Sequence, residues 1–203
     1  HSGVVHLLVN TAVQLETGAF FEREWGSGRW IVLYLSGAMG GSLLSCILDP
    51  DTVAATSSGS IMGLFGAKLS EILCQALFEQ DTRTLAGRRP TPGTEQVGGV
   101  LCWSAIVSLL GLLPYVDFTA HLGGLISGFV VGVVVFSCNI RSPCFSITWF
   151  VLGILLCGMV FSPAVLYLLF RSEPEMDLED ACEYYRALYT EGYDCTCTMV
   201  FDF

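Results

Sequence analysis

The chain of 203 residues is 53% hydrophobic and only 14% charged, and its mean hydropathy is +0.62. These values exclude an ordinary soluble domain, because such a domain needs more polar surface to cover its core. The formal net charge of −10 also disfavours nucleic-acid binding, since no basic patch is available to neutralise phosphates.

Six apolar runs of membrane-spanning length follow one another along the chain. A helix needs about 20 mostly apolar residues to cross a bilayer, and in lipid each backbone group of a helix is satisfied within the helix itself. We therefore predict an all-α fold, a polytopic transmembrane helix bundle with about six spans in the lipid bilayer. The runs are roughly 1–20, 29–48, 58–78, 97–115, 118–138 and 147–170.

The loops between the runs differ in charge from one side of the membrane to the other. Alternate connections carry arginine, whereas the two connections near 49–57 and 115–117 carry aspartate and no Lys or Arg. By the positive-inside rule, we expect the arginine-bearing loops in the cytoplasm and the 49–57 loop on the lumenal or extracellular side. The arginines are Arg23, Arg29, Arg83, Arg88, Arg89 and Arg141.

An acidic tail at 171–203 is predicted to follow a membrane domain at 1–170. From Glu173 onward the tail has nine acidic residues against the single basic residue Arg186. Charge topology places it on the lumenal or extracellular side, where an oxidising compartment permits disulfides. Disulfides or free thiols are favoured over a metal site, because the cysteine spacing does not fit a zinc half-site and no histidine is near. The tail cysteines are Cys182, Cys195 and Cys197.

A serine and a histidine stand near the predicted lumenal ends of two glycine-rich spans. Ser58 and Gly59 open the third run, and His121 precedes Gly124 and Gly128 on the fifth. Small residues at such spacing let helices approach closely. If the two glycine faces meet, Ser58 and His121 come within hydrogen-bond reach. A hydroxyl becomes a nucleophile when a neighbouring base accepts its proton, so these two residues are a candidate catalytic pair.

The first run carries polar residues that are unusual in a span, namely His1, His6 and Asn10. Positions 6 and 10 share one helix face. Such groups often join helices by hydrogen bonds, and for His1 this interpretation is favoured. His6 and Asn10 are also candidate donors to the oxyanion that forms during acyl transfer.

These residues resemble the motifs of the rhomboid family of intramembrane serine proteases, from residue 1 to about 135. The nucleophile-bearing helix of that family is similar to the segment at Ser58, and the helix that carries its base is similar to the segment at His121. The matching segments are His1-x₄-His6-Leu7-Leu8-x-Asn10, Glu22 to Arg29 as the cytoplasmic connection, Ser58-Gly59 with Leu64-Phe65-Gly66-Ala67, and Asp117 to Gly124.

The resemblance implies a role for each matched residue. Ser58 is implied to be the nucleophile and His121 the general base, while His6, Asn10 and the Ser58 backbone N–H form the oxyanion hole. His1 is implied to be a structural residue near the site. No cofactor is implied, and the implied substrates are single-span membrane proteins cut near the lumenal membrane face. The six runs would be spans two to seven of a six-plus-one arrangement whose first span and following loop precede residue 1.

Two other functions are compatible with parts of the sequence. A catalytically silent rhomboid-like protein that binds membrane clients is suggested by Thr56, which stands where the family has glycine. A transporter or channel is suggested only by the buried polar groups, and we see no internal repeat of the kind common in transporters. Lys68, ten residues into its helix, is expected either to pair with Glu71 or to mark thinning of the span toward the cytoplasm.

Overall fold

The structure is a computed structural model that describes residues 4–49, 57–78, 92–110, 117–140 and 142–170. Six α-helices and one short 3-10 helix make up nearly all of these residues, and no strand occurs among them. The prediction of an all-α chain is therefore confirmed. The predicted acidic tail lies outside the described residues.

The helices follow the six predicted apolar runs in order. Their bounds are α1 (Val4–Trp25), α2 (Ser27–Leu48), α3 (Ser57–Phe78), α5 (Pro92–Leu110), α6 (Phe118–Phe136), η1 (Ser137–Asn139) and α7 (Pro143–Phe170). Among the described residues, four helices are long and apolar enough to cross a membrane, namely α2, α3, α6 and α7, and α5 contains a shorter apolar stretch at Val97–Val107. The chain is thus a polytopic membrane helix bundle, as predicted.

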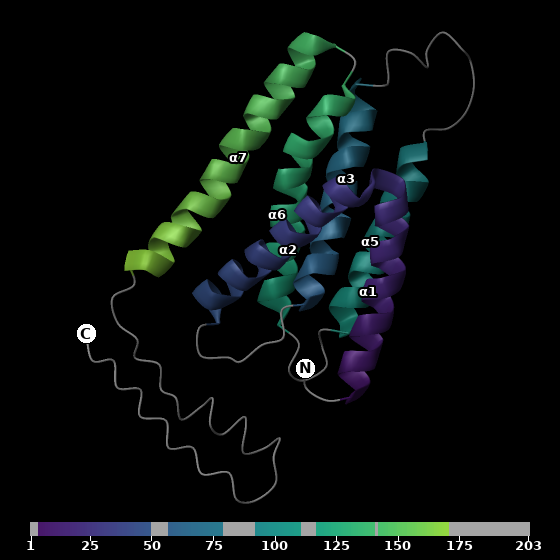
Figure 1. Cartoon of the computed structure of the whole chain (residues 1–203), viewed down its shortest axis with the longest axis vertical. Coiled ribbons are helices and arrows are strands. Elements are labelled where there is room, and N and C mark those ends of the chain that lie inside the picture. The colour runs from purple at the N-terminus through teal and green to yellow at the C-terminus, as the bar shows by residue number, and fades with distance from the viewer. Residues whose placement is uncertain (1–3, 50–56, 79–91, 111–116, 141, 171–203) are drawn as a thin grey trace, which may run out of the picture.

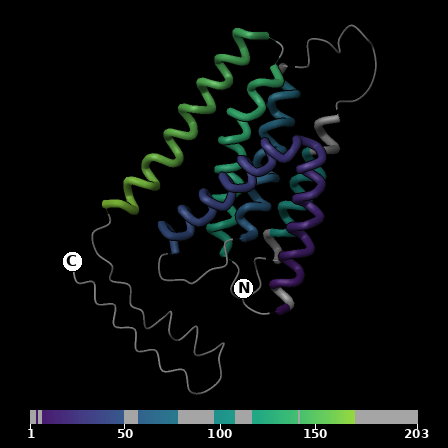
Figure 2. Tube along the Cα trace, in the orientation of Figure 1, coloured from purple at the N-terminus to yellow at the C-terminus, as the bar shows by residue number. Residues whose placement is uncertain are grey.

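The centre of the bundle consists of α3 and α6, and α2 crosses both of them obliquely (Figure 1, Figure 2). α7 leans against α6 on one side of this centre, while α1 and α5 lie on the other (Figure 1). The largest fully buried side chains come from α2, α3 and α6 and include Leu33, Ile61 and Phe136. α7 buries only Gly153 among its 28 residues. Its apolar side chains are therefore free to face lipid.

Glycines on α2 allow it to lie directly against the two central helices. A Cβ added to Gly37 would lie 2.8 Å from the Cα atom of Gly63 on α3, and one added to Gly41 would lie 2.7 Å from the carbonyl oxygen of Ala120 on α6. No side chain fits in either gap. In a membrane, helices associate by close packing of this kind rather than by expelling water.

The turn between α1 and α2 is tighter than the predicted connection between the first two apolar runs. The resemblance implies a connection over Glu22 to Arg29, but only Gly26 lies outside the two helices. Its φ of 80° is in the left-handed region that favours glycine. The Ser27 hydroxyl donates a 2.6 Å hydrogen bond to Glu22 Oε1 across this corner. A single glycine conformation and one side-chain bond thus replace the expected loop.

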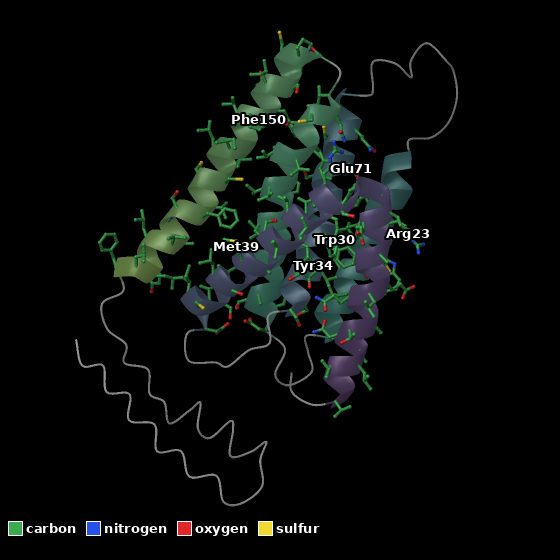
Figure 3. The ribbon with its side chains drawn as sticks, in the orientation of Figure 1. Arg23, Trp30, Tyr34, Met39, Glu71 and Phe150 are labelled. Carbon is green, nitrogen blue, oxygen red and sulfur yellow. The ribbon has the colours of Figure 1, made fainter. Side chains whose placement is uncertain are left out.

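Aromatic rings of α2 hold α1 in place. The rings of Trp30 and Tyr34 stack with their centroids 5.2 Å apart (Figure 3). Gly18 of α1 lies against the Trp30 ring, at 3.6 Å from an added Cβ, and the Gln14 side chain donates to the Tyr34 hydroxyl. These contacts fix the position of the half of α1 that carries Asn10.

An ionic cluster ties the far end of α1 to α3. Lys68 Nζ lies 2.8 Å from Glu71 Oε2 and also pairs with Glu24 of α1. Trp25 Nε1 donates to the same Glu71 oxygen at 3.1 Å. The prediction that Lys68 pairs with Glu71 is confirmed, and Glu24 is a second partner that the sequence did not indicate. Charges inside a bundle are tolerated when they are paired in this way.

Candidate active site

Ser58 is the second residue of α3 and is buried, with 7% of its surface exposed. The first four N–H groups of a helix have no partner within the helix, and the Ser58 N–H is one of them. The helix dipole also favours negative charge at this end. The start of α3 therefore places a hydroxyl and an available backbone donor at the same point.

His121 faces Ser58 from the first turn of α6. The imidazole is almost completely buried, with 1% exposed, and its Nε2 atom lies 2.6 Å from Ser58 Oγ. The two residues are 63 positions apart in the sequence. Which atom donates depends on the imidazole tautomer. With Nε2 unprotonated, the serine hydroxyl donates to it, which is the geometry that activates a nucleophile.

Glycines set the register that brings these two residues together. A Cβ on Gly124 would overlap the carbonyl oxygen of Gly59, and one on Gly128 would overlap the carbonyl oxygen of Gly63. A Cβ on Gly59 would itself lie 3.0 Å from the Ala120 carbonyl oxygen. The backbones of α3 and α6 are therefore in direct contact for more than one turn. Only this close approach lets short side chains at the helix starts meet.

Asp117 caps the helix that carries the histidine. Its Oδ1 accepts hydrogen bonds from the backbone N–H groups of Thr119 at 2.8 Å and Ala120 at 3.0 Å. Burial alone raises the pKa of the Asp117 carboxyl, but hydrogen bonds from Ser45, Thr119 and Ala120 outweigh it and hold that pKa below its ordinary value. The His121 N–H donates to the Asp117 carbonyl oxygen at 3.3 Å. The cap thus orients the first turn of α6.

The other predicted site residues lie on α1 or outside the described part of the chain. Asn10 is buried, with 7% exposed, and its Nδ2 donates to Ser57 Oγ at 2.9 Å. His6 lies one helical turn before Asn10 on α1, but its side chain is outside the described residues. The predictions that concern His1 and Thr56 also fall outside them. Among the described side chains, the structure brings Ser58, His121 and Asn10 to one end of the bundle.

Sequence reasoning did not single out the polar neighbours that surround the pair. Ser57 receives the Asn10 amide, and Asp117 was noted only as part of a motif and a loop charge. The sequence did contain a signal for Asp117, because an aspartate directly before a helix is a frequent N-cap residue. No sequence signal linked Ser45, on α2, to the Asp117 carboxyl. Its role depends on the oblique crossing of α2.

The site consists of a hydroxyl, an imidazole and amide donors. In the described part of the chain, no group of three or more His, Cys, Asp or Glu residues could hold a metal ion. The tail cysteines considered as ligands lie outside that part. The described arrangement can transfer a proton from Ser58 to His121 and can offer N–H groups to a developing negative charge.

Comparison with known proteins agrees with this arrangement of motifs. Residues 1–138 match the sequence profile of the Rhomboid domain family. RHOMBOID-like protein 4 of Arabidopsis thaliana is 37% identical over 136 residues, which are 66% of this chain and 31% of that protein. RHOMBOID-like protein 6, mitochondrial, from the same plant is 33% identical over 135 residues, 66% of this chain and 40% of that protein. No solved structure matches the chain.

A bacterial relative carries the name of a protease. The Rhomboid protease GluP of Bacillus subtilis (strain 168) is 33% identical over 132 residues, which are 64% of this chain and 23% of that protein. The chain spans between 23% and 40% of the length of these three relatives. The family match extends over α1 to α6 and so includes the whole candidate site. The chain is a multi-pass integral membrane protein of the rhomboid family, which includes proteases.

Proposed function

We propose that the protein is an intramembrane serine endopeptidase that cleaves single-span membrane proteins near the lumenal membrane face. The observation that carries the proposal is the 2.6 Å contact between Ser58 Oγ and His121 Nε2 at the buried starts of two adjacent helices. A serine and an imidazole at this distance are the minimum for nucleophilic catalysis. Membership of a family that includes proteases supports the same chemistry.

The first step forms an acyl-enzyme. Ser58 Oγ attacks the carbonyl carbon of the scissile peptide bond while His121 Nε2 takes the hydroxyl proton. The carbonyl oxygen becomes an oxyanion, and the tetrahedral species then breaks its C–N bond. His121 gives the proton to the departing amine, so the substrate's acyl group remains as an ester on Ser58.

The oxyanion is stabilised by donors that are already in place. The Ser58 backbone N–H has no acceptor within α3, and the Asn10 amide reaches Ser57, the residue before the nucleophile. We assign these two groups and the His6 side chain to the oxyanion hole. Preorganised donors of this kind contribute a factor of about 100 to 1,000 each in acyl transfer.

The second step hydrolyses the ester. His121 takes a proton from water, the resulting hydroxide attacks the acyl carbon, and the same proton returns to Ser58 Oγ as the product acid leaves. Water must reach a site whose nucleophile is 7% exposed. The helix starts are at the end that the loop charges predict to be lumenal, so we assign both water entry and cleavage to that membrane face.

The test uses the full-length protein reconstituted in lipid nanodiscs with fluorescent single-span substrates. We expect cleavage and labelling of Ser58 by a fluorophosphonate probe, and Ser58→Ala and His121→Ala are each expected to abolish cleavage. Ser60→Ala is the matched control, because Ser60 is buried on the same helix but is not part of the pair. It should retain activity.

Two outcomes would contradict the proposal. Folded protein that neither cleaves any substrate nor reacts with the probe is not a serine protease. Binding of membrane clients that is unchanged in Ser58→Ala, with no cleavage by either version, would instead support the catalytically silent alternative that Thr56 suggests.

A further inference from the structure

The cysteines in the described part of the chain differ in where they stand relative to the membrane. All of them are free thiols. Cys74 is buried and its thiol donates to the Phe136 carbonyl oxygen at 3.7 Å, so it behaves as a small core residue. The remaining five are partly or fully exposed, namely Cys46, Cys102, Cys138, Cys144 and Cys157. The depth of each thiol therefore decides which chemistry can reach it.

Two of these five thiols stand at mid-membrane depth. Cys102 lies in the middle of the apolar stretch Val97–Val107 of α5. Cys157 follows Pro143, the first residue of α7, by fourteen residues, which is about 21 Å along the helix in a hydrocarbon core about 30 Å thick. A thiol in apolar surroundings stays protonated and unreactive. Lipid contact is the only consequence of exposure at these two positions.

Cys138 and Cys144 stand at the corner between α6 and α7. Cys138 is in η1 directly after α6, and Cys144 is the second residue of α7. Figure 1 shows the end of α6 and the start of α7 together at one end of the bundle. The Ser146 hydroxyl donates to the Ser137 carbonyl oxygen at 2.9 Å, which ties the neighbours of the two cysteines to each other. The structure thus presents two exposed thiols at a single corner.

This corner is at the membrane face opposite to the Ser58–His121 pair. Cys138 follows His121 by seventeen residues of continuous helix, which is about 25 Å and close to the thickness of the hydrocarbon core. Because His121 is in the first turn of α6, the corner lies at the other boundary of that core. The connection carries Arg141, and the positive-inside rule predicts that this face is cytoplasmic.

The start of α7 is apolar and has few protein contacts. Phe145 and Ile147 follow Cys144 and are exposed, and Gly153 is the only buried residue of this helix. With 28 residues, α7 is about 42 Å long and exceeds the thickness of the core, so it must tilt or extend beyond the core. A hydrocarbon chain attached at the corner would lie in lipid beside these apolar side chains.

We infer that Cys138 and Cys144 are modification sites that carry long-chain fatty acyl groups as thioesters. Cysteines next to the membrane boundary are the usual positions of reversible S-acylation, and the acyl donor is a long-chain acyl-coenzyme A from the cytoplasm. The cysteine thiolate attacks the acyl carbonyl carbon, and the bond from that carbon to the coenzyme A sulfur breaks. Coenzyme A leaves as a thiol with the proton that the cysteine lost, so no oxidant or reductant is needed.

The expected role of the two acyl groups is to anchor the corner in the cytoplasmic leaflet. They add lipid contacts where α7 has the fewest protein contacts, and they fix the depth of a helix that is longer than the core. Hydrolysis of the thioesters reverses the effect. The inference does not depend on the chemistry of the Ser58–His121 pair, which lies at the other face.

The test counts thioesters on the full-length protein produced in insect cells. Free thiols are blocked with N-ethylmaleimide, thioesters are cleaved with neutral hydroxylamine, and the released thiols are tagged with a polyethylene glycol maleimide that retards the protein on a gel. We expect two tags on the wild type, one on Cys138→Ser and on Cys144→Ser, and none on the double variant. Mass spectrometry of tagged wild-type peptides gives the same assignment without relying on the fold of a variant.

Cys46→Ser is the matched control. Cys46 is exposed and lies two residues before the end of α2, so it is also a thiol near a membrane boundary, but at the face predicted to be lumenal. This variant should keep both tags. Cys102→Ser removes an exposed thiol at mid-membrane depth and should keep both tags as well.

Four results would overturn the inference in whole or in part. Absence of any hydroxylamine-dependent tag on the wild type means that neither thiol is acylated. Tags that persist in the double variant, or that disappear in Cys46→Ser, place the modification elsewhere. Tags that appear after dithiothreitol but not after hydroxylamine identify an oxidised thiol instead of a thioester. If only one of the two single variants loses a tag, the assignment of the other cysteine is wrong.

Discussion

The start and the middle of α3 are held by different physical means. At its start, Ser58 is in direct contact with α6, and glycines let the two backbones touch. Ten residues later, Lys68 joins α1 to α3 through two carboxylates. The start contains a hydrogen bond between a hydroxyl and an imidazole, and the middle contains full charges beside the Trp25 ring.

The start of α3 thus carries the proposed reactive group, whereas its middle anchors the helix to α1. The proposed nucleophile and base must stay available to a substrate, and their position is set by the packing of the α3 and α6 backbones. The ionic cluster has no such constraint, and Trp25 adds a further hydrogen bond to the Glu71 carboxylate. Variants at the start and in the middle of α3 should therefore affect different quantities.

The largest effect on stability is expected at the ionic cluster. Lys68→Met leaves Glu71 buried without its cation, and breaking a buried pair in this way typically costs about 3 to 5 kcal/mol. We expect a loss of that order in the free energy of unfolding, measured in lipid bicelles by steric trapping. Adding Glu71→Leu to Lys68→Met should restore part of it, because the stranded carboxylate is removed.

Arg23 provides the matched control for Lys68. It is an exposed cation on α1 whose side chain points away from the bundle (Figure 3), so Arg23→Met should change stability by well under 1 kcal/mol. Equal losses in the two variants would mean that α1 is sensitive to any change of charge, and the cluster would lose its anchoring role.

An intermediate effect is expected where α3 and α6 touch. A Cβ on Gly128 would overlap the backbone of Gly63, and overpacking of this kind costs about 1 to 3 kcal/mol. Because the helices must separate, Gly128→Ala should also lengthen the Ser58–His121 contact and lower kcat more than stability alone explains. Cleavage rates normalised to folded protein test this expectation.

Gly158→Ala is the control for helix packing. An added Cβ at Gly158 of α7 would meet nothing within 4 Å, so this variant should leave stability and cleavage unchanged or slightly raise helix stability. Unaltered activity in Gly128→Ala would show that the glycine contact does not set the geometry of the Ser58–His121 pair.

The sequence predicted the helices well because their signal is local. Each apolar run is long, and the helices that formed from them differ from the predicted ranges mainly at their ends, as at Trp25 and Gly26. The glycine spacing on α6 likewise indicated which face would approach α3, and Gly124 and Gly128 do meet that helix. At these two glycines, the helix contact predicted from the residue spacing is the contact that the structure shows.

Contacts that depend on how three helices cross could not be predicted from the sequence. Glu24 lies 44 residues from Lys68, and its role follows from the corner at Gly26, which turns α1 back along the bundle. A cavity of about 330 Å³ lined by residues of α1, α3 and α5 likewise forms only when these helices pack together, so the sequence did not predict it.

The smallest effect is expected at the Asp117 cap, close to His121. Asp117→Ala removes the acceptor for two backbone N–H groups of α6 and should cost about 0.5 to 2 kcal/mol, the usual value of an N-cap. Asp117→Asn keeps a neutral acceptor, so comparing the two substitutions separates capping from charge. Because His121 follows in the same turn, kcat should fall in the alanine variant.

The pH dependence of the cap has a definite sign. The pKa of Asp117 is lower in the folded protein than its ordinary value, so its ionised form stabilises the fold above the unfolded-state pKa, which is about 3.9. That contribution is lost as pH falls through the folded-state pKa. The stability difference between wild type and Asp117→Asn should therefore be largest at neutral pH and shrink below about pH 4. A difference that is constant from pH 7 to pH 3 would show that the carboxylate charge does not stabilise the start of α6, and that at this end of the bundle, unlike at Lys68, hydrogen-bond geometry alone holds the helix.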